Sequence, residues 1–203
     1  MDSKVAVLFS LGEASRSRKW PDYLEHGFTE DDVSELVQLV LDKDLHEAEG
    51  KSKEVWVPLH AWRALGQIRS PKAVDPLLSM FDYLENDDWA LEELPLVMGM
   101  IGESSLEALS NFLHDGAHGE YARAMAAHGI KEVVVHNPQA RGNAVKLLTD
   151  YLEEPDPENI SLNALVVNYL MDLKAKESIE TIRSLYAKGL ADLASAGDIE
   201  DVE

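Results

Sequence analysis

A stretch of this chain repeats after 33 residues, and this repeat constrains the fold more than any other feature. The letters WVPLHAWRALGQI, which begin at Trp56, match WALEELPLVMGMI, which begins at Trp89, in their apolar pattern. Gly66 falls on Gly99 in the same alignment. Repeats of about 20 to 50 residues are typical of solenoids and other stacked architectures. We therefore expect similar helical units stacked on one another.

The best copy of the repeat reads as two helices. In the first, Pro58, Ala61 and Leu65 recur at spacings of three and four, which places them on one helical face. Pro71 ends that helix and suits the first turn of the next one. A weaker copy of the second helix begins near Leu173. No stretch of comparable length alternates with period two, so we expect no β-sheet.

These helix pairs predict an all-α fold, an α-solenoid or α-α superhelix of about five antiparallel pairs. One pair cannot bury its apolar face alone, so the pairs are expected to stack into a single domain over residues 1–203. Thr29 is a candidate N-cap in the first pair, with Asp32 three residues later. We place the units at about 3–45, 54–84, 86–115, 119–153 and 158–188, followed by an acidic tail at 189–203.

Two stretches resemble the HEAT-like repeat of the phycobilisome-lyase type. The letters WRALGQI from Trp62, followed by PKAVDPLL from Pro71, resemble that family's first and second helices. A second match runs through Met100 and continues at residues 105–109. The whole chain also resembles a group of bacterial HEAT-like proteins of unassigned function. The resemblance covers residues 54–115 best and implies an armadillo-type fold, but it carries no catalytic motif with it.

One stripe of side chains is a candidate binding site for a ligand or partner. Trp56 and His60 lie four residues apart on one predicted helix, and Trp89 and Glu93 take the matching positions on the next. Arg63 extends the stripe. Two aromatic faces beside an imidazole and a carboxylate suit a peptide or a planar ligand. The favoured alternative is packing between units, with His60 and Glu93 hydrogen-bonded across the seam.

A second cluster, HDGAHGE at residues 114–120, contains four potential metal ligands. His114 and His118 are the weak candidates, because a zinc or nickel site would need both on one helical turn. The two glycines indicate a loop instead. We therefore expect an exposed polar loop, no bound metal and no other cofactor.

Composition excludes several classes of function. There are 18 Lys and Arg against 38 Asp and Glu, which gives a net charge of −20. Nucleic acids and anionic membranes both select a basic footprint, so neither is an expected partner. The chain has no cysteine, which excludes disulfides and thiolate chemistry. The N-terminus has no secretory pattern and no apolar run could span a membrane, so we expect a cytoplasmic protein.

The functional prediction is a non-catalytic scaffold that binds a partner protein or peptide, neutral or basic in charge. An extended solenoid surface suits such a partner, and an acidic surface favours a basic one. The alternative is an accessory subunit of a lyase or other modifying enzyme that acts on a partner protein. Activity of the chain alone is not expected, because it contains no identifiable catalytic nucleophile. The oligomeric state stays open.

Overall fold

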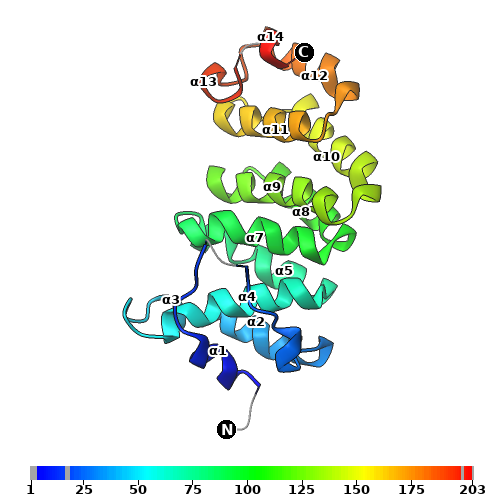
Figure 1. The fold of residues 1–203 in the computed structure, drawn as a ribbon. Coiled ribbons are helices and arrows are strands. Elements are labelled where there is room, and N and C mark those ends of the chain that lie inside the picture. Colours follow the sequence, from blue (N-terminus) through cyan, green and yellow to red (C-terminus); the bar gives the residue numbers. More distant parts are fainter. Residues whose placement is uncertain (1–3, 17–18, 198, 203) are drawn as a thin grey trace.

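The computed structural model describes residues 4–16, 19–197 and 199–202, and within these ranges it contains helices, turns and irregular segments but no strand (Figure 1). The α-helices are α1 (Ala6–Leu11), α2 (Val33–Leu41), α3 (Lys43–His46), α4 (Val57–Ile68), α5 (Val74–Leu78), α6 (Phe81–Leu84), α7 (Asp88–Ile101), α8 (Leu106–His114), α9 (Glu120–His136), α10 (Arg141–Glu153), α11 (Ile160–Asp172), α12 (Ile179–Ala187), α13 (Leu193–Ala196) and α14 (Ile199–Val202). Short 3-10 turns are η1 (Leu24–His26), η2 (Glu30–Asp32), η3 (Glu54–Trp56), η4 (Pro71–Ala73), η5 (Glu103–Ser105), η6 (Pro138–Ala140) and η7 (Lys176–Ser178). None of the helices in these ranges combines the length and apolar character that crossing a membrane demands.

The helices form two stacked layers. In the first-helix layer, α4 packs against α7, α7 against α9 and α9 against α11. In the second-helix layer, α2 packs against α5, α5 against α8, α8 against α10 and α10 against α12. Figure 1 shows the pairs following one another along the molecule from the N-terminal to the C-terminal end. The predicted all-α solenoid is confirmed.

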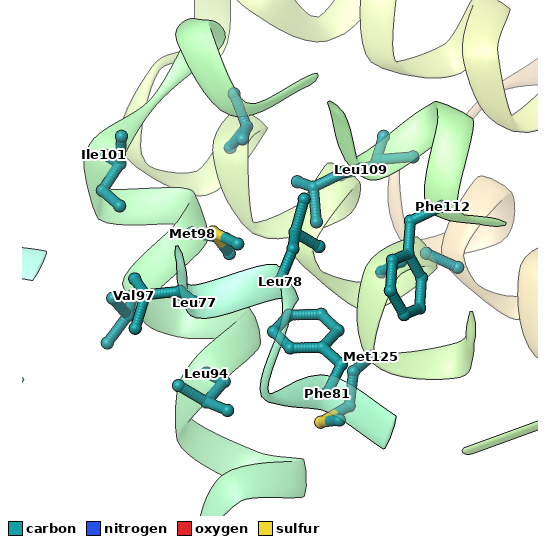
Figure 2. Packing of buried hydrophobic residues seen from close by; sticks show 14 of the residues in the cluster. Leu77, Leu78, Phe81, Leu94, Val97, Met98, Ile101, Leu109, Phe112 and Met125 are labelled. Atoms are coloured by element: carbon teal, nitrogen blue, oxygen red, sulfur yellow. The ribbon is translucent and has the colours of Figure 1, made fainter. Parts of the chain in front are cut away.

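A continuous apolar core joins consecutive pairs. Figure 2 shows side chains from α5, α6, α7, α8 and α9 meeting in one cluster. The labelled members are Leu77, Leu78, Phe81, Leu94, Val97, Met98, Ile101, Leu109, Phe112 and Met125, and all are buried. The rings of Phe81 and Phe112 meet edge to face with centroids 5.6 Å apart. Full burial of such a side chain is worth about 1.5–3 kcal/mol, so each pair depends on its neighbours for stability.

The turns use the chemistry that the sequence indicates. Asp32 Oδ2 accepts hydrogen bonds from the Thr29 backbone N–H, at 2.7 Å, and from its hydroxyl, at 3.1 Å. This is the expected capping arrangement, and it precedes η2. The second helix of the best repeat, in contrast, divides into α5 and α6. Ser79 Oγ donates to the Pro76 carbonyl at 2.7 Å and so competes with continuation of the helix.

The repeated glycines mark the closest approaches within the first-helix layer. A Cβ placed on Gly99 of α7 would lie 2.6 Å from the Cβ and 2.8 Å from the carbonyl oxygen of Glu132 in α9. A Cβ on Gly66 of α4 would lie 3.3 Å from side-chain atoms of Val97 and Met100 in α7. Only glycine permits the backbone contact at Gly99, because no side chain stands between the two helices.

The C-terminal segment differs from the expected acidic tail. Within residues 189–203 it contains α13 and α14, and Ala196 is buried. The Asp192 backbone N–H donates to the Ile160 carbonyl at 3.2 Å, and Asn168 Nδ2 donates to the Ser195 carbonyl at 3.0 Å. Small apolar residues between the acidic ones allow this segment to pack on α11. Residues 198 and 203 of the expected tail, and residues 3, 17 and 18 of the first expected unit, lie outside the described ranges.

Replacing Gly99 with alanine is expected to lower the free energy of unfolding by about 1–3 kcal/mol. The added methyl group overlaps the backbone of Glu132, which cannot move aside as a side-chain end can. Denaturant unfolding followed by circular dichroism measures the change.

Gly142→Ala is the matched control. Gly142 also lies in a helix, α10, but nothing stands within 4 Å of its Cβ position. This variant is expected to gain about 0.5 kcal/mol, because alanine restricts the unfolded chain. Equal effects at the two positions would contradict the close approach of α7 and α9.

Candidate functional site

The structure brings the two tryptophans of the candidate stripe together. Trp56 ends η3, directly before α4, and Trp89 is the second residue of α7. Their rings meet edge to face, with centroids 5.4 Å apart and planes at 87°. Both are half-buried, and they border a hollow of about 120 Å³. Stacking of α4 on α7 therefore produces the ring contact that the 33-residue register implies.

Arg63 and Glu93 form a buried ion pair beneath the tryptophans. Arg63 Nε donates to Glu93 Oε2 at 2.8 Å, and Arg63 Nη2 donates to Glu93 Oε1. The indole N–H of Trp62 adds a third hydrogen bond to Oε2, at 3.0 Å. A bidentate guanidinium and a further donor satisfy the carboxylate in a site from which water is excluded. The pair joins α4 to α7 and fixes their register.

His60 turns away from this pair and contacts the N-terminal segment. Its Nε2 lies 2.9 Å from the Gly12 carbonyl, which can only accept, so Nε2 carries the proton. Its Nδ1 then accepts from the Tyr23 hydroxyl at 2.7 Å. Burial, supported by the nearby Arg63 charge, lowers the pKa of His60 below its usual value, although the Gly12 bond and Glu93 oppose this. The expected hydrogen bond between His60 and Glu93 is absent from the described residues, because Arg63 occupies the carboxylate.

The N-terminal segment covers the open face of α4. We call residues 12–16 and 19–23 the N-terminal strap; Figure 1 shows this part of the chain passing from α1 across α4 to α7 and back. Gln67 holds it with both amide atoms: Nε2 donates to the Pro21 carbonyl and Oε1 accepts from the Tyr23 N–H, each at 2.8 Å. Trp20 lies over the guanidinium of Arg63, with 4.8 Å between the guanidinium carbon and the ring centroid. The strap explains why nearly all of α4 is buried.

The strap reaches as far as α7 in the first-helix layer, where Arg16 makes the contacts. Arg16 pairs with Glu92 at 3.2 Å, and its guanidinium carbon lies 4.6 Å from the Trp89 ring centroid. Both Arg16 and Glu92 are exposed, so this ion pair is weak. His60, Arg63 and Glu93 lie inside the protein beneath the strap. Only the two tryptophans of the five candidate residues keep contact with solvent.

Beyond the strap, α9 presents an uncovered face. The α9 stripe comprises the residues of this helix that recur at spacings of three and four and are not buried, namely Tyr121, Ala124, His128, Lys131 and Val135. Tyr121 is 57% exposed and Val135 is 61% exposed. The His128 ring stacks nearly parallel on Tyr169 of α11, with centroids 5.4 Å apart. The stripe thus joins exposed apolar groups to an aromatic contact between neighbouring helices.

A buried carboxylate anchors the α9 stripe. Glu132 accepts from Lys131 Nζ at 2.6 Å and lies 3.2 Å from His128 Nε2. Burial opposes ionisation of Glu132, but the hydrogen bonds and charges of His128 and Lys131 outweigh it and lower its pKa to about 2. Glu132 therefore stays ionised and fixes the side chains of His128 and Lys131 in place.

The two weak metal candidates contact different groups. His114 closes α8, and its Nδ1 bonds to the Ser110 carbonyl at 2.8 Å. His118 Nδ1 lies 2.8 Å from an Asp82 carboxylate oxygen, and its ring stacks on Phe112 at 3.7 Å. Residues between them form a loop, and no group of three potential ligands in the described ranges could hold a metal ion.

Sequence reasoning missed the strap. The signal available was a set of three polar side chains, His60, Arg63 and Gln67, on one face of a helix that is otherwise apolar on all sides. Such side chains need buried partners. The partners of His60 and Gln67 lie on an irregular segment more than 30 residues away, and no periodicity reports them.

Replacing Glu93 with leucine is expected to lower the free energy of unfolding by about 3–5 kcal/mol, because Arg63 then stays buried without a counter-charge. The double variant Arg63→Met/Glu93→Leu is expected to lose much less, since it removes both charges. Denaturant unfolding of the single variants and the double variant measures this coupling. A double variant as unstable as the sum of the single losses would contradict a paired buried site.

His60 is expected to make stability depend on pH. Its folded-state pKa is depressed, so the unfolded chain takes up the proton first as the pH falls below about 6.5. The stabilisation is complete above that pH and is lost as the pH falls toward the folded-state pKa. Unfolding free energies at pH 7.5 and pH 5.5 compare the wild type with His60→Gln. The variant is expected to lose less stability between the two, and an equal loss would contradict this role.

Comparison with known proteins adds one match. Residues 60–83 fit the family described as PBS lyase HEAT-like repeat. They run from within α4 into α6, the same stretch that carries the best sequence repeat. Neither the curated proteins nor the solved structures contain a match. Residues 60–83 are thus similar to a HEAT-like repeat, and stacked helix pairs lie on both sides of this stretch.

Proposed function

We propose that this protein is a non-catalytic scaffold that binds a partner protein or peptide. HEAT-like repeats as a class mediate protein interactions. Their stacked helices form long surfaces whose shape does not depend on any one side chain. This proposal rests on the first-helix layer, where one part is covered by the strap and another part is open.

The single observation that carries the proposal is the exposure of Tyr121 and Val135. They are among the most exposed large apolar side chains in the described ranges, and both lie on the α9 stripe. In the same layer the strap lies against α4, so an extended segment of chain already packs on this layer. An exposed apolar surface of this kind is typical of a protein interaction site. We infer that the partner lies on α9, beyond the end of the strap.

The proposed partner is a neutral or basic segment, extended like the strap or helical. The net charge of −20 attracts cationic chains over distances of about 10 Å. Arg16 illustrates the chemistry at the edge of this face, where a guanidinium contacts both an indole ring and a carboxylate. An accessory role in a modifying enzyme would use the same face, and the identity of the partner would distinguish it.

The test compares affinity capture by wild-type protein and by Tyr121→Ala/Val135→Ala. The variant is expected to lose a partner that the wild type retains, because both apolar contacts are removed. Its fold is expected to stay unchanged, since both side chains are largely exposed. Circular dichroism checks the fold, and mass spectrometry quantifies the retained protein.

Tyr83→Ala/Leu193→Ala is the matched control. Tyr83 is 39% exposed and Leu193 is 59% exposed, and they lie on α6 and α13, outside the first-helix layer. This variant is expected to retain the partner. Retention by the α9 variant, or equal loss by the control, would contradict the proposed surface.

A further inference from the structure

A second surface lies at the C-terminal end of the solenoid, apart from the α9 stripe. A half-open groove of about 460 Å³ runs between the end of α11, the turn η7 and the start of α12. Its apolar floor comprises Leu170, Met171, Ala175, Ile179 and Ile182. Its rim comprises Lys174, Lys176 and Arg183. We call this site the end groove.

The end groove reverses the charge of the chain around it. All three charged residues that line it are cations, although the protein carries a net charge of −20. Lys174 and Lys176 are exposed and make no ion pair within the described residues. Arg183 pairs with Glu180, which is on its own helix. Solubility alone does not call for cations at this end, because acidic side chains would serve equally well.

The register of the repeats shows what normally occupies this position. When η5 and α8 are aligned with η7 and α12, Met98 corresponds to Met171 and Leu109 corresponds to Ile182. Both Met98 and Leu109 face α9, the first helix of the following pair. A Cβ on Gly129 of α9 would lie 3.2 Å from Leu109 and 3.4 Å from Met98. Inside the solenoid, therefore, a helix packs on the surface that the end groove leaves open.

The rim positions of the end groove differ in charge from those of the third pair. The residues that correspond to Lys174, Lys176 and Arg183 are Ile101, Glu103 and Ser110. Glu103 accepts a hydrogen bond from Asn137 of the next pair at 3.0 Å. At this seam the Glu103 carboxylate accepts a hydrogen bond from Asn137, whereas the rim of the end groove carries cations. Its complement must therefore supply carboxylates.

The C-terminal helices leave the groove open. They contact the start and middle of α11 through Ile160 and Asn168, and Tyr186 near the end of α12 through the Gly197 carbonyl, at 3.3 Å. The groove lies at the opposite ends of the two helices. Arg141 of α10 fixes the turn that borders the groove, because its guanidinium donates to the Leu173 and Lys174 carbonyls at 2.9 Å. The site is thus supported from one side and accessible from the other.

We propose that the end groove binds an acidic amphipathic helix of a partner protein. Apolar side chains at helical spacing pack on the floor, as α9 packs on the corresponding surface of the third pair. Carboxylates flanking them pair with Lys174 and Lys176. This surface selects the charge opposite to that of the partner proposed for the α9 stripe, and neither site depends on the other.

The test measures fluorescence anisotropy of synthetic helical peptides that carry leucine at positions i, i+3, i+4 and i+7 and glutamate beside them, in each register. A peptide with lysine in place of glutamate is the charge control. We expect the acidic peptides to bind the wild type and the lysine peptide not to bind. Lys174→Glu/Lys176→Glu is expected to weaken binding by about tenfold or more, which corresponds to about 1.4 kcal/mol.

Further variants test separately whether binding depends on the net charge of the protein, on the apolar floor of the groove and on the location of the site. Lys43→Glu/Lys51→Glu makes the same change in net charge at the far end of the molecule and is expected to leave the affinity unchanged. Met171→Gln keeps the side-chain size but not its apolar character, and is expected to weaken binding severalfold. Failure of all acidic peptides to bind, or equal binding by the groove variant, overturns the proposal. The α9 variant is expected to bind these peptides normally, so the two proposals fail independently.

A second copy of this chain is the competing occupant. Sedimentation velocity of the wild type and of Lys174→Glu/Lys176→Glu distinguishes a partner helix from a second copy as the occupant. We expect both to sediment as the same species. Self-association of the wild type that the groove variant loses would assign the groove to a second copy and overturn a partner helix.

Discussion

The direct packing of α7 on α9 is the contact on which the rest of the molecule depends. At Gly99 the two helices approach so closely that a single methyl group would meet the backbone of Glu132. This approach brings the core clusters of neighbouring pairs into one continuous interior (Figure 2). It also places the buried Glu132 carboxylate where it orients Lys131 and His128 on the outer side of α9.

The N-terminal strap divides the first-helix layer into a closed and an open part. Over α4 the strap supplies partners for His60 and Gln67 and covers the ion pair of Arg63 with Glu93. Beyond Arg16 the layer continues to α9, where Tyr121 and Val135 are exposed near the two ends of the helix. The same layer thus stabilises the fold at one end and offers a binding surface in its middle.

The two proposed surfaces differ because they interrupt the solenoid in different ways. The α9 stripe is a side of the stack, where a partner adds to a layer that is already complete. At the end groove, none of the described helices packs on the surface that α9 covers in the third pair, and the partner helix occupies that position. Cations at Lys174 and Lys176 make that last position selective, whereas the third pair has Ile101 and Glu103 at the corresponding sites.

The repeat of Trp56 and Gly66 at Trp89 and Gly99 was enough to predict helix pairs, their stacking and the contact between the two tryptophans, because periodic apolar spacing reports which helical faces are buried. Local turn chemistry at Thr29 and Asp32 was equally predictable. The sequence did not predict the partner of His60, the strap or the folded C-terminal segment. These features depend on irregular segments that contact residues far away in the sequence. Tertiary structure alone decided which polar residues became buried and which helix faces stayed open.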